Sequence, residues 1–302
     1  MGEKLLVIGS VAYDCIETPL DSADFILGGS ASYAALAASY FAPTMISAIV
    51  GNDFKDSDIK RLTARSIDLS NIQFNSKKPT FFWRGKYHAN FNSRETLDVR
   101  LNAYEDFEPK LNAEARNAKY VLLGNISTSI QSSLLDLVEK PDFVILDTMD
   151  LWISTERSSL VELVRRCDLL ILNDSEAKMF ADTSNIILAG KELMKMGAKS
   201  VIIKTGEYGA MLFHTDGFFV IPAYPVSSLH DPTGAGDSFA GALAGYIAGR
   251  GSADFETIRN GMLAGAATAS MTVESFSCYK LEDNGFDEIK RRCDFIKKIS
   301  QI

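Results

Sequence analysis

Residues 230–241 combine glycines, a threonine and two aspartates in the order His-Asp-Pro-Thr-Gly-Ala-Gly-Asp-Ser-Phe-Ala-Gly. Gly234 and Gly236 have no Cβ, so the backbone can turn tightly and aim the N–H groups of Ala235, Gly236 and Asp237 at one point beyond the start of a helix. Such a point attracts anions, phosphate among them. The segment therefore predicts a phosphate-binding loop.

Asp237 is the unusual residue of this loop, because a carboxylate beside an anion site repels phosphate. As a general base it would accept the proton of an attacking hydroxyl, while backbone donors and Mg²⁺ offset the charge on the phosphoryl group. Alternatively, Asp237 only occupies the first turn of a helix, where the helix dipole favours acidic side chains. The residue by itself leaves both interpretations open.

The elements that must position this loop can be read from hydrophobic patterning. Short apolar runs are typical of strands buried on both faces of a sheet, and they occur at residues 5–8, 45–50, 120–123, 143–146, 169–172 and 201–203. Helical patterns lie between them, at residues 31–41, 59–66, 132–139, 160–166 and 189–196. This alternation predicts an α/β fold, with a doubly wound, mostly parallel sheet flanked by helices.

Residues 79–101 break the alternation, because aromatic side chains are scattered there among polar ones without a helical period. We expect extra strands outside the main sheet, which serve either as a lid or interface or as an ordinary edge hairpin. Without a linker or an internal repeat, residues 1–302 are expected to form a single domain, with a small β lid from about 10–20 and 79–105.

Composition narrows the function class. The chain has 302 residues and a formal net charge of −8, which argues against an extended nucleic-acid or anionic-membrane footprint. Its four cysteines are scattered rather than closely paired, and the first apolar run is too short for a signal sequence or a spanning helix. We therefore expect a cytoplasmic enzyme with a small-molecule substrate.

Four further segments agree in order with the loop. They are Gly28-Gly29 before a small-residue helix, Val50-Gly51-Asn52-Asp53, Asn173-Asp174-Ser175-Glu176, and Lys204-Thr205-Gly206-Glu207-Tyr208-Gly209. Together with the run from Asp231 to Asp237 they resemble the motifs of the PfkB, or ribokinase-like, family of carbohydrate and nucleoside kinases. The resemblance spans essentially the whole chain, and it implies transfer of the γ-phosphoryl group of ATP to a hydroxyl of a sugar or a nucleoside.

The resemblance also implies roles for individual residues. Asp237 would be the catalytic base, and Gly234, Ala235 and Gly236 would form the anion hole. On the nucleotide side, the implied residues are Asn173, Glu176, Thr205, Gly206, Gly209, Thr233, Ala264 and Gly265. Glu176 would organise Mg²⁺ through water, and Asp231 with Thr233 resembles a site that holds a monovalent cation such as K⁺ in some members. Asn173 and Glu176 also fit a helix cap, and both roles can hold together.

On the acceptor side, Asp14, Gly28, Gly29 and Tyr33 match positions that face the substrate. Asp14 can accept two hydrogen bonds from hydroxyl groups. Tyr33 departs from the asparagine of many sugar kinases, so either the pocket stacks a ring and takes nucleosides, or Tyr33 and the aromatic residues near Trp83 are packing residues. Some family members form dimers through the lid, so the resemblance leaves both a homodimer and a monomer open.

The sequence leaves two other functional classes as alternatives. A catalytically silent nucleotide- or sugar-binding regulatory protein could use the same fold. The triplet Gly236-Asp237-Ser238 also fits a serine hydrolase, but nothing in the spacing supplies Ser238 with a histidine base and an oxyanion hole together.

Overall fold

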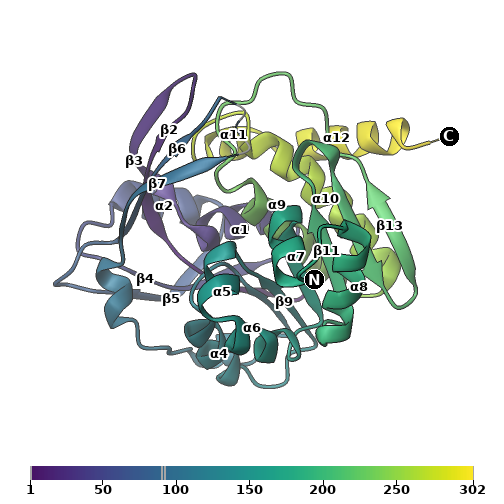
Figure 1. The fold of residues 1–302 in the computed structure, drawn as a ribbon. Helices are drawn as coiled ribbons and strands as arrows, with labels where there is room; N and C mark the ends of the chain where they lie inside the picture. Colours follow the sequence, from purple (N-terminus) through teal and green to yellow (C-terminus); the bar gives the residue numbers. More distant parts are fainter. Residues whose placement is uncertain (1, 90, 92, 302) are drawn as a thin grey trace.

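The computed structural model describes residues 2–89, 91 and 93–301. Its centre is a nine-stranded sheet in which β12 and β13, at one edge, run antiparallel to their neighbours and the other seven strands are parallel (Figure 1). In order across the sheet, the strands are β13 (Gly217–Ile221), β12 (Ala210–His214), β11 (Ser200–Lys204), β10 (Leu169–Asn173), β9 (Phe143–Asp147), β8 (Tyr120–Leu123), β1 (Leu5–Ile8), β4 (Thr44–Val50) and β5 (Asp68–Phe74). The predicted doubly wound, mostly parallel sheet is confirmed.

Helices cover both faces of this sheet, because successive side chains of each buried strand point to opposite sides. Leu5 and Val7 of β1 lie in one core, and Leu6 and Ile8 lie in the other. The first core is closed by α1 (Ser30–Ala38), α2 (Asp56–Ala64), α9 (Ala235–Arg250), α10 (Phe255–Thr272), α11 (Tyr279–Asp283) and α12 (Phe286–Ile299). The second is closed by α3 (Ala113–Arg116), α4 (Thr128–Asp136), α5 (Asp150–Thr155), α6 (Arg157–Val164), α7 (Asp174–Phe180) and α8 (Ile186–Met196).

A second, four-stranded sheet stands apart from the large one, at the upper left of Figure 1. Its order is β3 (Ser22–Gly28), β2 (Ala12–Glu17), β6 (Phe81–Tyr87) and β7 (Arg94–Arg100). The aromatic stretch 79–101 thus forms strands outside the main sheet, together with β3, which the sequence interpretation did not include. One face of the small sheet packs on α2, where the Tyr13 hydroxyl donates to Asp58 Oδ2 at 2.8 Å.

Helix α9 packs closely against α1, and this contact fixes the position of its N-terminus. A Cβ placed on Gly241 would lie 2.1 Å from the Ala34 carbonyl oxygen of α1, and one on Gly245 would lie 2.7 Å from that of Ala38. The two glycines are four residues apart, so they form one face of α9 that only small residues can occupy. This packing holds the N-terminus of α9 beside the ends of the central strands.

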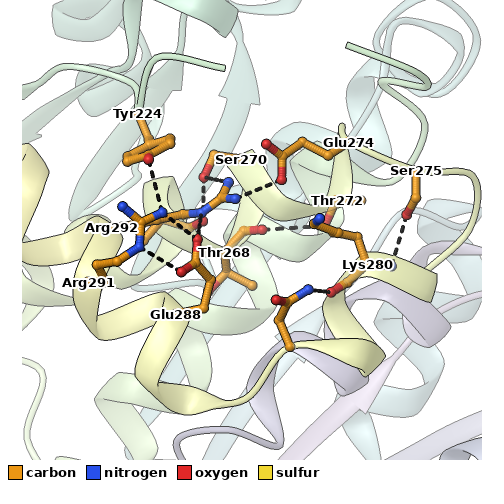
Figure 2. Close-up of polar contacts among 12 residues, drawn as sticks. Tyr224, Thr268, Ser270, Thr272, Glu274, Ser275, Lys280, Glu288, Arg291 and Arg292 are labelled. Atoms are coloured by element: carbon orange, nitrogen blue, oxygen red, sulfur yellow. Dashed lines mark hydrogen bonds and ion pairs between the residues drawn. The ribbon is translucent and has the colours of Figure 1, made fainter. Parts of the chain in front are cut away.

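The end of α10 is fixed by a buried cation, as Figure 2 shows. Arg292 of α12 donates to Ser270 Oγ at 2.9 Å and to the carboxylates of Glu274 and Glu288 at 2.7 Å each. All three of its side-chain nitrogens therefore have partners, which a buried charge requires. Just beyond α10, the Val273 carbonyl oxygen accepts the N–H groups of residues 230 and 231, so the same helix end anchors the start of the glycine-rich loop.

No helix within the described residues is long and apolar enough to cross a membrane.

Candidate active site

The glycine-rich loop turns directly into α9. Gly234 has a φ of 75°, in the left-handed region that glycine adopts without strain, and α9 begins at Ala235. The Ala235 N–H donates to the Pro232 carbonyl oxygen at 3.2 Å. The Ala235 N–H, which the sequence predicted to face the anion, is thus occupied within the loop. This leaves the N–H groups of Gly236 and Asp237 at the head of the helix, where the backbone dipoles favour an anion.

Tyr33 lies directly against this turn. A Cβ on Gly234 would come within 2.3 Å of the Tyr33 ring, so a side chain at position 234 would displace the tyrosine. Tyr33 is 1% exposed, and within the described part of the chain its hydroxyl has no hydrogen-bond partner. The contact gives Tyr33 a packing role against the loop, and its role toward an acceptor stays a prediction.

The carboxyl ends of three neighbouring parallel strands lie beside the glycine-rich loop. Asp147, Asn173 and Lys204 are the last residues of β9, β10 and β11, and Asn173 is in register with Lys204. In open α/β sheets, ligands bind outside these carboxyl ends. The tertiary structure therefore brings a carboxylate, an amide and an ammonium to one edge, facing the start of α9.

Lys204 places a positive charge directly beside the loop. Its side chain is 17% exposed, and its Nζ lies 3.5 Å from Asp147 Oδ1. A Cβ on Gly236 would lie only 2.8 Å from this Nζ. Gly236 does not have a positive φ, so its backbone conformation does not require glycine. Glycine is required at this position because a side chain would collide with the Lys204 ammonium.

Asp237 has the electrostatics of a general base. Burial and the negative charge of Asp147 raise its pKa to about 6, while Lys204 and Arg94 act in the opposite direction. A carboxylate with this pKa is ionised at neutral pH, yet more basic than an exposed aspartate.

Asn173 and Glu176 form the helix cap that their spacing predicts. Asn173 Oδ1 accepts the Glu176 N–H at 2.8 Å, and Glu176 Oε2 accepts the Asn173 N–H at 2.8 Å. Burial raises the pKa of Glu176 to about 7, against the effect of Lys204. No group of three or more His, Cys, Asp or Glu residues among those described could hold a metal directly. The expected role of Glu176 toward a hydrated Mg²⁺ stays a prediction.

Asp14 lies on the acceptor side, against the two glycines of the Gly-Gly pair. A Cβ on Gly28 would be 1.9 Å from Asp14 Oδ2, so only glycine leaves room for this carboxylate. The next glycine, Gly29, has a φ of 91°, and its N–H donates to Asp14. Burial, with the charges of Asp231 and Asp237, raises the pKa of Asp14 to about 8.

The face of the small sheet that carries Asp14 combines apolar and aromatic side chains with Thr96 and Arg94 of β7, which pair with Gly85 and Tyr87. Asp14 is paired with Ile26 of β3 and with Trp83 of β6, so these three side chains point to the same side. Tyr87 follows on this face of β6, and it joins Ile26 and Trp83 in one buried cluster. Phe82 points to the opposite side and packs on Phe25, so strand alternation separates it from the other two aromatic residues.

The small sheet reaches the glycine-rich loop through one hydrogen bond. Thr233 Oγ1 donates to the Tyr87 hydroxyl at 3.0 Å, and the Thr233 N–H donates to Asp231 Oδ1 at 2.9 Å. Asp231 is buried, and its second oxygen has no partner within the described residues. Burial raises the pKa of Asp231 to about 6. An unpartnered buried carboxylate oxygen fits the cation site that the sequence predicts at Asp231 and Thr233.

The remaining nucleotide-side residues lie in two places. Thr205 closes the loop after β11, because its N–H and its hydroxyl both donate to the Gly209 carbonyl oxygen, at 2.8 and 3.0 Å. Gly206 and Gly209 have φ values of 58° and 103°, which this tight loop needs. Ala264 and Gly265 lie on α10, and Gly265 packs on Phe239 of α9. Their contact with a nucleotide stays a prediction.

Ser238 has no features of a nucleophile. It is fully buried in α9, and its hydroxyl accepts a 2.8 Å hydrogen bond from Thr272 of α10. It therefore serves the packing of α9 against α10, and the hydrolase alternative finds no support in the geometry.

Three site residues were not assigned roles from the sequence. Lys204 entered the sequence interpretation only as the first residue of a loop motif and Arg94 only within the aromatic stretch, whereas Asp147 was not named at all. The register of β9 to β11 could have suggested Lys204 and Asp147, since polar residues directly after neighbouring buried strands meet at one edge. No signal indicated Arg94, because its role depends on how the small sheet folds over the cleft.

Comparisons with known proteins agree on one family. The family model described as "pfkB family carbohydrate kinase" matches residues 2–284. A cytidine kinase of Thermococcus kodakarensis is 30% identical over 254 residues, which cover 82% of this chain and 89% of that protein. Among solved structures, the nucleoside kinase of Burkholderia thailandensis in complex with inosine has a TM-score of 0.76 at 20% identity, covering 97% of this chain and 98% of that one. A ribokinase II candidate of Escherichia coli with ATP and Mg²⁺ has a TM-score of 0.79 at 19% identity, covering 97% and 99%.

Proposed function

Because this chain belongs to the pfkB family of carbohydrate kinases, and is therefore a phosphotransferase with an alcohol group as acceptor, we propose that it phosphorylates a nucleoside with ATP as donor. The main support for a nucleoside as the acceptor is the face of the small sheet on which Asp14 lies beside Trp83 and Ile26. A carboxylate suits the hydroxyls of a ribose, and an aromatic and aliphatic surface suits a flat base. The names of the relatives, cytidine kinase and nucleoside kinase, support the same acceptor class.

In the proposed reaction, Asp237 accepts the proton of the acceptor hydroxyl. The hydroxyl oxygen forms a bond to the γ-phosphorus while the bond from that phosphorus to the β-bridging oxygen breaks, and ADP leaves with the electron pair. The N–H groups at the head of α9 donate to the phosphoryl oxygens, whose charge they stabilise through the transfer. Asp14 holds the acceptor by accepting hydrogen bonds from other hydroxyls.

Two ions belong to the proposal. Mg²⁺, when bound, neutralises phosphate charge, and Glu176 would hold one of its waters, since that carboxylate is buried beside the loop and forms no direct metal site. A monovalent cation such as K⁺ would bind the unpartnered oxygen of Asp231.

We further propose a homodimer that forms through the small sheet. β7 is an edge strand of that sheet, and Leu97, Val99 and Leu101 at its end are 44%, 53% and 52% exposed. An exposed apolar edge favours pairing with a second chain. Sedimentation of the wild type and of Val99→Lys would test this, since a monomeric wild type contradicts the dimer.

The kinase proposal is tested by a coupled assay of ADP release with Mg–ATP against cytidine, uridine, adenosine, inosine and ribose, with Asp237→Asn as control. We expect turnover with at least one nucleoside, and a loss of roughly 10²–10⁴-fold in kcat in the variant, which is the usual contribution of a general base. ATP affinity, measured by calorimetry, should survive in Asp237→Asn. Unchanged turnover in the variant would remove Asp237 from the chemistry, and preferential turnover of ribose would replace the nucleoside by a sugar.

A further inference from the structure

The ammonium of Lys204 has unused hydrogen-bonding capacity at the phosphate loop. Among the described residues its one hydrogen bond is to Asp147, at 3.5 Å. Charge-assisted hydrogen bonds of this type are usually about 2.7–2.9 Å long, and the pair of Lys199 and Asp168, which directly precede β11 and β10, has 2.6 Å. An ammonium has three donors. Lys204 is thus held in place loosely, with donors left over, although it is mostly buried.

The position of this charge agrees with a ligand at the head of α9. The space at Gly236 that a Cβ would fill is where the ammonium lies, at 2.8 Å. Burial lowers the pKa of Lys204, but the charges of Asp147, Glu176 and Asp237 outweigh burial and raise the pKa above its ordinary value, so the ammonium is charged at neutral pH. A phosphoryl group at the head of α9 could accept hydrogen bonds from the free donors of Lys204. The ammonium would then offset part of the negative charge that the phosphoryl group brings next to Asp147 and Asp237.

We propose that Lys204 is a catalytic residue of this chain that contacts the transferring phosphoryl group from the side opposite the N–H groups of α9, and that Asp147 positions it. This inference rests on the proposed kinase activity. The Gly236 N–H and the Lys204 ammonium then bind the same phosphoryl group. The positive charge of Lys204 stabilises the negative charge on the phosphoryl oxygens in the transition state.

The test compares Lys204→Met, which keeps the length of the side chain and removes the charge, with Lys199→Met, which removes a largely exposed lysine five residues earlier. Removing one such electrostatic donor usually costs about 10²–10³-fold in kcat, and we expect a loss of this size for Lys204→Met and none for Lys199→Met. Calorimetry without an acceptor should give a weaker affinity of Lys204→Met for ATP and an unchanged affinity for adenosine. That pair of titrations does not depend on turnover, so it tests Lys204 even if no acceptor is found.

Two further variants separate a chemical role from a structural one. Gly236→Ala is compatible with the helix backbone and should keep the melting temperature, yet its Cβ displaces the ammonium, so kcat should fall in this variant as well. In Lys204→Ala, added ethylammonium should restore part of kcat in a saturable way. Full ATP affinity and a kcat within threefold of wild type in both Lys204→Met and Gly236→Ala would overturn the role of Lys204 while leaving the kinase intact. A wild type without turnover on any acceptor, but with ATP affinity that depends on Lys204, would instead count against the proposed function alone.

Discussion

Replacing Gly28 by alanine tests whether the position of Asp14 controls the acceptor site. Gly28 ends β3 with an ordinary φ, so alanine fits its backbone, but the new Cβ would lie 1.9 Å from Asp14 Oδ2 and 2.3 Å from its Cγ. Contacts of a Cβ below 3.0 Å are essentially never observed, so the carboxylate must retreat by about 1.1 Å. A shift of about 1 Å in a group that positions substrate can cost on the order of 10²-fold.

The magnitude follows from the hydrogen bonds that Asp14 would lose. Burial raises the pKa of Asp14 to about 8, so the assay is run above that pH, where Asp14 is ionised. A hydrogen bond to a charged group contributes about 1.5–3 kcal/mol, which corresponds to roughly 10- to 150-fold in kcat/KM for the nucleoside. ATP affinity should not change, because Asp14 is on the acceptor side. Steady-state kinetics with varied acceptor, together with ATP titration, measures both quantities. Gly285→Ala is the matched control, since a Cβ there meets no atom within 4 Å.

A double-mutant cycle decides whether Asp14 is the cause. If Gly28→Ala acts by displacing the carboxylate, Asp14→Ala and the double variant should lose the same kcat/KM, and the two changes should not add. If the losses add, or if Gly28→Ala has normal acceptor kinetics, the explanation that position 28 is glycine because it leaves room for Asp14 is refuted.

Two further predictions concern the acidic groups. Because the pKa of Asp237 is raised to about 6 and the base must be ionised, kcat at saturating nucleoside and Mg–ATP should fall about tenfold per unit of pH below 6; a pH–rate profile checks this, and the same acid limb in the residual activity of Asp237→Asn would assign it to another group. Glu176→Gln keeps an oxygen that can accept the Asn173 N–H and so retains the helix cap, but it removes a charge beside the phosphate loop. We expect an unchanged melting temperature and a higher Mg²⁺ concentration for half-maximal rate, and an unchanged Mg²⁺ dependence would argue against a role in holding the ion.

Much of the fold and part of the site could be predicted from the sequence because the signals are local. Buried parallel strands are continuous apolar runs, and the glycine-rich loop carries its own turn and helix start, so β1, β4, β8 to β11 and the beginning of α9 were all predicted. Strands β5, β12 and β13 were missed because they lie at or next to the sheet edge and their side chains are only partly buried. The Asn173–Glu176 cap was readable for the same local reason, as both partners lie within one helical turn.

What the sequence by itself determined is the class of protein: ordered motifs, each within a few residues, define a kinase of known fold with Asp237 at the head of a helix. Only the tertiary structure decided which residues meet. Lys204 and Asp147 are 57 residues apart and come together because β9 and β11 flank β10 in the sheet. Trp83 and Phe82 are neighbours in sequence, yet strand alternation places only Trp83 beside Asp14. Short-range patterns fix backbone conformation, whereas the charge and shape of a site depend on contacts between distant segments that no local pattern encodes.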